Sequence, residues 1–173
     1  MALLVLAFPV LDPKDLESIQ SWREKNDELF DIVEPHFTIV FAVDDEPEEE
    51  FIKEIELQTK GVGKIEFEIK RAIVHKDEFR DVYHVFLVPG KGYAEMIELH
   101  DKLYSGRLLP HWRRAIEYIP HITIGNSKDR SKCKQAVDEL NSKELFIRGR
   151  IESLTIADHS NKVVRKIKQL DME

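Results

Sequence analysis

The sequence predicts an α+β fold made of a duplicated unit, with two similar lobes that face each other. Three observations support this fold class. Strand and helix patterns alternate along the 173 residues, the order of elements repeats in the second half, and one short motif recurs at the matching point of each half. We therefore expect one bilobal domain over residues 1–173, with halves of about 1–80 and 81–173.

The first half is predicted to contain a strand, a helix, a strand, a helix and a strand. Leu3–Val10 is almost entirely apolar, as expected for a strand that is buried on both faces. Asp12 or Pro13 then begins a helix that ends near Asn26, because both residue types favour the start of a helix. The remaining elements of this half are a strand at Phe37–Val43, a helix at Pro47–Lys60 and a strand at Lys64–His75.

The second half repeats this order and adds a strand at its end. Its elements are a strand at Tyr83–Val88, a helix at Gly92–Tyr104, a strand at His121–Gly125, a helix at Asp129–Asn141 and a strand at Phe146–Ala157. A final strand at Lys162–Leu170 is expected to pair with the preceding one across a turn near Ser160-Asn161. The connection from Gly106 to His121 is longer than its counterpart in the first half.

The composition excludes several classes of protein. Hydrophobic residues make up 42% of the chain, which is enough for a sizeable core and excludes a disordered chain. The 26 basic and 33 acidic residues give a formal net charge of −7, so long duplex nucleic acid is not an expected partner. The single cysteine, Cys133, excludes an internal disulfide and a cysteine-based zinc site.

The apolar N-terminal run Ala2–Val10 predicts neither a membrane anchor nor an export signal. It is too short to span a bilayer, and it lacks the basic start and the small-residue cleavage pattern of a secretory signal. We therefore expect a cytoplasmic protein that does not contact a membrane. We also expect a monomer.

The strongest functional signal is a motif that occurs twice. It is Pro35-His36-Phe37-Thr38 in the first half and Pro120-His121-Ile122-Thr123 in the second. Because side chains alternate along a strand, the histidine and the threonine of each copy share one face, and the apolar residue between them points to the other. Each strand would therefore present an imidazole and a hydroxyl about 7 Å apart, from a rise of about 3.3 Å per residue.

Two histidines and two threonines around one site suit the cleavage of a phosphodiester. In-line displacement at phosphorus needs a base on one side and an acid on the other. Histidine, with an unperturbed pKa of about 6.5, can take either part near neutral pH. Threonine hydroxyls can donate hydrogen bonds to the non-bridging oxygens. The alternative is structural: a histidine bonded to a neighbour and a threonine that favours a strand, both preserved by the duplication.

The two motifs, about 85 residues apart, resemble those of the 2H phosphoesterase superfamily. That superfamily includes the LigT-like 2′–5′ RNA ligases and the cyclic nucleotide phosphodiesterases. Tyr118, three residues before His121, and the Leu99-His100…Leu103 stretch are also similar to the family. The resemblance implies a bilobal fold in which two antiparallel-containing sheets face a central cleft with helices packed outside. It also implies hydrolysis or formation of bonds at 2′,3′-cyclic phosphates or 2′–5′ linkages.

By motif match, His36 and His121 would be the acid–base pair, and Thr38 and Thr123 would bind phosphate. The resemblance also implies that no metal is required. A zinc site that used both motif histidines would need a third ligand, which the spacing does not supply, so we expect no metal and no cofactor. The expected substrate is a small nucleotide or an RNA terminus.

One position departs from the family pattern. Many LigT-like members have a phosphate-binding arginine three residues after the second motif threonine, where this chain has Asn126. Arg113, Arg114 or Lys128 could supply that charge, since residues 106–132 are locally basic; a solvated loop with incidental charge is the alternative. His84 is a further candidate for the cleft wall, with a core or edge position as its alternative.

Other functions remain open on the sequence alone. A non-catalytic module that binds a nucleotide or an RNA end would use the same four side chains, and a 2′–5′ RNA ligase would differ only in the direction of the reaction. A purely structural duplicated domain is the third alternative.

Overall fold

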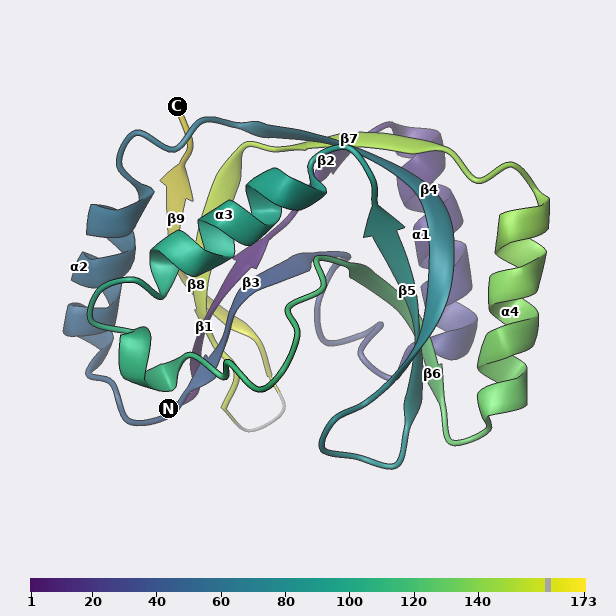
Figure 1. Cartoon of the computed structure of the whole chain (residues 1–173), viewed down its shortest axis with the longest axis horizontal. Coiled ribbons are helices and arrows are strands. Elements are labelled where there is room, and N and C mark those ends of the chain that lie inside the picture. Colours follow the sequence, from purple (N-terminus) through teal and green to yellow (C-terminus); the bar gives the residue numbers. More distant parts are fainter. Residues whose placement is uncertain (161–162) are drawn as a thin grey trace.

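The computed structural model describes residues 1–160 and 163–173. The chain forms two antiparallel sheets with helices on the outside (Figure 1). One sheet has the order β3-β1-β8-β9, and the other has the order β2-β7-β4-β5-β6. The α+β fold class predicted from the sequence is confirmed.

The bounds of most elements agree closely with the predicted ranges. The helices are α1 (Pro13–Asn26), α2 (Glu48–Thr59), α3 (Tyr93–Leu103) and α4 (Arg130–Ser142), with a short 3-10 helix at Leu109–His111. The strands are β1 (Leu3–Ala7), β2 (Val10–Leu11), β3 (Phe37–Val43), β4 (Ile65–Lys76), β5 (Tyr83–Pro89), β6 (Ile122–Ser127), β7 (Ile147–Ile151), β8 (Ser153–Asp158) and β9 (Arg165–Asp171).

Local chemistry explains where the helices begin. Asp12 accepts a hydrogen bond from the backbone N–H of Lys14 at 2.9 Å, and Pro13 occupies the first turn, so α1 begins where the sequence predicts. Asp129 caps α4 in the same way through Ser131. In Figure 1, α2 and α3 lie over the four-stranded sheet on the left, and α1 and α4 lie against the five-stranded sheet on the right.

Two predicted strands were wrong as single elements, because each is divided between the two sheets. Leu3–Val10 separates into β1, in the four-stranded sheet, and β2, in the five-stranded sheet. Pro9, which has no N–H for a sheet hydrogen bond, lies between them. Phe146–Ala157 separates in the same way into β7 and β8, on either side of Glu152. A continuous apolar run does not reveal such a change of sheet.

Each sheet combines strands from both halves of the sequence. β4, from the first half, lies between β5 and β7, whereas β8 and β9, from the second half, extend the sheet that contains β1 and β3. The sheets therefore do not divide near residue 80, and an origin by internal duplication stays a prediction. β8 and β9 pair as an antiparallel hairpin, as predicted. The predicted turn at Ser160-Asn161 and the predicted strand start at Lys162 fall on or beside residues 161–162, which lie outside the described residues.

The core joins the two sheets behind the motif strands. Phe37, on the apolar back of the first motif, meets Phe67 of β4 edge to face, with ring centroids 5.1 Å apart, and both side chains are buried. Ile122 and Ile124, on the back of the second motif strand, are buried in the same core. The apolar faces that the alternation predicted therefore point inward. None of the helices among the described residues combines the length and the hydrophobicity that a membrane-spanning helix requires.

Candidate functional site

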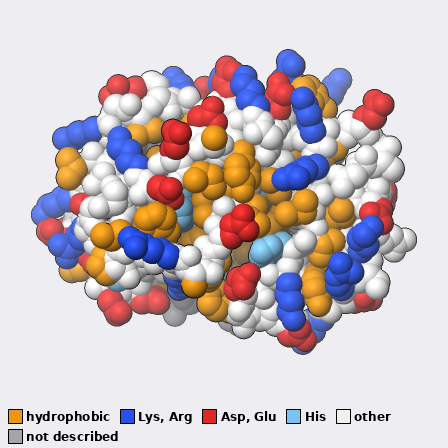
Figure 2. Space-filling view, in the orientation of Figure 1, with side chains coloured by type: hydrophobic (Ala, Val, Ile, Leu, Met, Phe, Trp, Pro, Cys, Tyr) orange, Lys and Arg blue, Asp and Glu red, His pale blue; other side chains and the backbone are white. Residues whose placement is uncertain are grey.

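A cavity of about 420 Å³, called the cleft below, is lined by both copies of the motif. His36 and Thr38 reach it from the start of β3 in one sheet, and His121 and Thr123 reach it from the start of β6 in the other. Figure 2 shows apolar side chains gathered over the middle of the molecule on this view, with acidic side chains and a histidine beside them. The fold therefore brings together two pairs of side chains that lie about 85 residues apart in the sequence.

Both motif histidines are held by the same local bond. The Nδ1 of His36 donates to the carbonyl of Glu34 at 2.8 Å, and the Nδ1 of His121 donates to the carbonyl of Ile119 at 2.5 Å. In each case the acceptor lies two residues earlier, across a proline. Because a carbonyl can only accept, the proton is on Nδ1, and Nε2 is the nitrogen of each ring that is left for chemistry.

Enclosure lowers the pKa of both histidines. Loss of contact with bulk water lowers the pKa of His121 to about 3, and the nearby imidazoles of His36, His75 and His84 act in the same direction. Burial also lowers the pKa of His36 from its ordinary value, with a smaller contribution from the Arg23 guanidinium. Both rings are therefore neutral at neutral pH.

Aromatic rings form one wall beside His121. The His121 ring stacks on Phe86 with centroids 3.5 Å apart and an interplanar angle of 12°, and His75 and His84 also stack on Phe86, at 4.9 and 5.6 Å. His84, a predicted candidate, lines the cleft and bonds through Nε2 to Asp77 at 2.9 Å. His75 was not expected there, although it lies directly opposite His84 in the β4–β5 pair.

Asp77 anchors this ring stack. Although burial opposes ionisation, hydrogen bonds from His84 and from the backbone N–H groups of Phe79 and Arg80 lower the pKa of Asp77 to about 2. Asp77 is therefore a carboxylate at neutral pH. Among the described residues, the Nδ1 of His84 is the one buried side-chain nitrogen or oxygen without a hydrogen-bond partner.

The opposite wall is also aromatic, and it clamps the first motif strand. The Tyr118 hydroxyl donates to the carbonyl of Thr38 at 2.9 Å, and the Nδ1 of His100 donates to the carbonyl of Ile39 at 2.7 Å. The two rings stack with centroids 3.8 Å apart. Burial raises the pKa of Tyr118, so its hydroxyl stays protonated as a donor. The segment that leads into His121 is thus bonded to the strand that carries Thr38.

Of the three basic residues predicted to supply positive charge, only one lines the cleft. Arg113 lines the cleft and lies over the exposed Phe79 ring at 5.1 Å, whereas Arg114 and Lys128 are not among the cleft-lining residues. Arg114 lies over Trp112 at 5.0 Å. Arg107 bonds to Glu46 at 2.7 Å, so part of the charge of this segment is offset by an acidic partner.

Two cleft-lining residues that the sequence reasoning missed are Arg23 and Asp27, which form a buried ion pair at the end of α1. Their spacing of four residues, on the same helix face as the buried Ile19, is a signal that could have identified them. No group of three or more His, Cys, Asp or Glu side chains that could hold a metal ion occurs within residues 1–160 and 163–173.

Comparisons with known proteins agree on the architecture. A family model described as the 2'-5' RNA ligase superfamily matches residues 11–163. Among solved structures, apo LigT of E. coli is 17% identical with a TM-score of 0.57, over 99% of this chain and 96% of that chain. The Thermus thermophilus protein TT0787 is 12% identical with a TM-score of 0.62, over 99% and 98%.

Kluyveromyces marxianus Usb1 is 10% identical with a TM-score of 0.58, over 99% of this chain and 98% of that chain. Other crystal structures of E. coli LigT hold 3'-AMP, ATP, NADP+ or phosphate. Identities this low show a shared fold alone. A search of curated proteins found no match.

Proposed function

The chain belongs to the 2'-5' RNA ligase superfamily, and from this membership we propose that it is a 2H-type phosphoesterase. The proposed substrates are 2′,3′-cyclic phosphates or 2′–5′ phosphodiesters of RNA ends or small nucleotides. The observation that supports the proposal best is the convergence of both motifs on one cleft, with each histidine bonded through Nδ1 to a carbonyl and left with Nε2 free to react.

The proposed reaction uses the two imidazoles on opposite sides of phosphorus. One neutral ring accepts the proton of a water molecule or a ribose hydroxyl at Nε2, while the other, protonated at Nε2, donates to the leaving oxygen. Thr38 and Thr123 donate hydrogen bonds to the non-bridging oxygens, on which negative charge increases in the transition state. We propose that these protein groups are sufficient, without a metal or another cofactor.

The low pKa of the histidines suggests how the acid is supplied. Both rings are neutral at neutral pH, because burial disfavours the imidazolium. A phosphodiester anion beside a ring favours the charged form and raises its pKa, so substrate binding itself would recruit the proton that the acid needs.

The size of the cleft and the ligands of a relative support a small substrate. Ligand pockets commonly measure about 300–1,000 Å³, and the cleft, at about 420 Å³, lies in this range. E. coli LigT has been crystallised with 3'-AMP and with phosphate. We propose that a ribose phosphate group enters between the two motifs, and that the aromatic wall containing Tyr118 contacts the rest of the molecule.

A turnover assay tests the proposal directly. The protein is incubated in EDTA with a panel of 2′,3′-cyclic nucleotides and 2′–5′ dinucleotides, alongside the variants His36→Ala, His121→Ala and the matched control His111→Ala, which lies outside the cleft lining. Each motif variant should lose about 10²–10⁴ in kcat and keep the wild-type circular dichroism spectrum, and the control should keep its activity. Equal turnover by wild type and both motif variants would refute the assignment.

The second candidate is a module that binds a phosphate ligand without turnover. It is favoured by the neutrality of both rings, because a neutral ring cannot act as the general acid until a ligand raises its pKa. Binding of cyclic nucleotides to the wild type without any product over a long incubation would support this module instead. Accumulation of a 2′–5′ linked product from two RNA fragments would identify ligation.

A further inference from the structure

A buried ion pair lies at the end of α1, beneath the first motif. The Nε of Arg23 donates to the Oδ2 of Asp27 at 2.7 Å, and each side chain is only 2% exposed. Both residues line the cleft. An ion pair removed from water is poor evidence for stability, because the cost of desolvation offsets most of the attraction between the charges. The position of this pair therefore needs another explanation.

Arg23 holds the segment that leads into the first motif. Its Nη2 donates to the carbonyl of Val33 at 2.6 Å and to that of Leu29 at 3.3 Å. The next residue after Val33 is Glu34, whose carbonyl receives the Nδ1–H of His36. The carbonyl of Val33, which Arg23 holds, and the carbonyl of Glu34, which orients the His36 ring, thus belong to consecutive residues.

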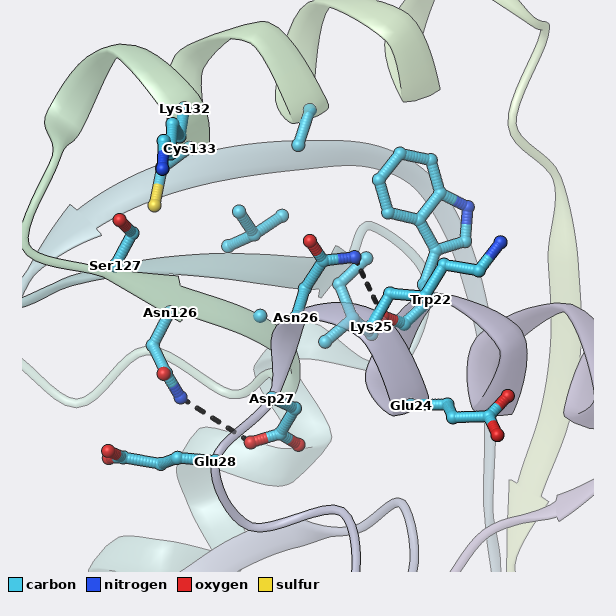
Figure 3. Close-up of a pocket in the computed structure, with 14 residues that line it drawn as sticks. Trp22, Glu24, Lys25, Asn26, Asp27, Glu28, Asn126, Ser127, Lys132 and Cys133 are labelled. Atoms are coloured by element: carbon cyan, nitrogen blue, oxygen red, sulfur yellow. Dashed lines mark hydrogen bonds between the residues drawn. The ribbon is translucent and has the colours of Figure 1, made fainter.

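Asp27 reaches the second motif strand. Its Oδ1 accepts a hydrogen bond from the Nδ2 of Asn126 at 3.4 Å, as the dashed line in Figure 3 shows. Asn126 pairs with His84 and Thr123 pairs with Phe86 across the β5–β6 ladder, with an irregularity between these pairs. Since His84 and Phe86 are two residues apart on β5, Asn126 and Thr123 share one face despite their odd spacing.

A glycine permits this close approach of α1 to β6. A Cβ atom at Gly125 would lie 2.9 Å from the Cβ of Asn26, which is closer than real Cβ contacts. Any larger residue there would force the end of α1 or the strand to shift, and so would disturb the approach of Asp27 to Asn126. Figure 3 shows this end of α1 lying against the strand that carries Asn126 and Ser127.

We infer that Arg23 and Asp27 form a positioning pair that ties the segment before His36 to the strand carrying Thr123, and so sets the placement of one motif relative to the other. This inference rests on the proposed function, because it assigns the pair a part in that reaction. Neither residue is a catalytic residue in it: Arg23 is 1% exposed and acts through the backbone that orients His36.

The charges around His36 make this role measurable. Arg23 and Asp27 face His36 from the end of α1, the first lowering and the second raising its pKa, and His159 lowers it from the segment after β8. His36 in turn lowers the pKa of His121 on the other sheet. Lys166 of β9 lies over the neighbouring Phe8 ring and is bonded to Glu34.

The test compares Arg23→Gln, Asp27→Asn and the control Lys25→Gln, an exposed cation on the same helix. With a cyclic nucleotide as substrate, the first two variants should lose about tenfold to a hundredfold in kcat through misplacement of His36. The limb of the pH–rate profile that belongs to His36 should move to higher pH in Arg23→Gln and to lower pH in Asp27→Asn. Lys25→Gln should match the wild type.

The inference would be overturned if Arg23→Gln and Asp27→Asn both fold and both keep the wild-type kcat and the wild-type position of the His36 limb. It would also be overturned if the His36 limb moved in the same direction in both variants. If Arg23→Gln does not fold, Arg23→Lys and Asn126→Ala replace it: the lysine should keep the His36 limb near its wild-type position, and the alanine should lower kcat with the limb unmoved. Wild-type kcat in Asn126→Ala, or a His36 limb that moves in Arg23→Lys, would overturn the inference.

A readout without turnover separates this inference from the proposed function. NMR titration of the His36 ring in the wild type, Arg23→Gln and Asp27→Asn should show the two opposite pKa changes, whether or not a substrate is known. Opposite changes together with an inactive wild type would refute the phosphoesterase and leave the positioning pair. An active wild type with unchanged His36 titration in both variants would refute only the pair.

Discussion

Acid should destabilise this protein through His121, and His121→Asn should remove that effect. The pKa of this imidazole is about 3 in the folded chain, against an ordinary value of 6.5. Below pH 6.5 the unfolded chain therefore binds a proton that the folded chain does not, so stability falls as the pH falls toward 3. Asparagine at position 121 can still donate a hydrogen bond to the carbonyl of Ile119, so the variant keeps the local bond that His121 makes.

The magnitude follows from the two pKa values. One pH unit of unequal protonation corresponds to about 1.4 kcal/mol, so the interval from pH 6.5 to pH 5 corresponds to about 2 kcal/mol. Loss of the His121 stack on Phe86 adds a cost that does not depend on pH. The stability of the wild type minus that of the variant should therefore fall by about 2 kcal/mol between pH 8 and pH 5.

Urea unfolding followed by tryptophan fluorescence at pH 8, 7, 6 and 5 measures this difference. The variant cancels the contributions of the titrating groups that do not interact with His121, and His159→Asn, outside the cleft lining, is the matched control. A difference between wild type and His121→Asn that stays constant over this pH range would show that the folded state accepts a proton at His121 normally, and the reasoning from burial would fail.

Two further predictions concern the cleft. Inorganic phosphate should bind with uptake of a proton near neutral pH, because an anion raises the lowered pKa values of His36 and His121. It should also bind more tightly as the pH falls. A calorimetric binding heat that is the same in buffers of different ionisation enthalpy would contradict this prediction. Tyr118→Phe should cost about 1 kcal/mol in urea unfolding, since the carbonyl of Thr38 loses its donor; a stability equal to that of the wild type would show that this bond contributes nothing.

Local pattern predicted local structure well. The bounds of β3 are those predicted, and α1 begins at its cap, because alternation and capping are decided by neighbouring residues. The two histidine motifs were found because they repeat. The fold places both motifs in the lining of one cleft, and the catalytic roles of their histidines are a proposal.

Long-range features were not visible in the sequence. The break between β1 and β2 falls inside one apolar run, and both parts look alike until their partners are known. Phe86 and His75 look like ordinary strand residues, yet the β4–β5–β6 pairing places them beside His121. The irregularity between the Val85 and Phe86 pairs likewise puts Asn126 on the face of Thr123, which simple alternation assigns to the other side.

The way the strands are shared between the sheets has a consequence for synthesis. β1 lies between β3 and β8, and β4 lies between β5 and β7. Neither sheet can therefore be completed until β7 and β8, which follow residue 146, have been synthesised. On a ribosome, the first motif is made long before β8 exists to support β1. Until β8 is made, β1 therefore presents an unpaired edge, which is the kind of edge that can pair with another chain.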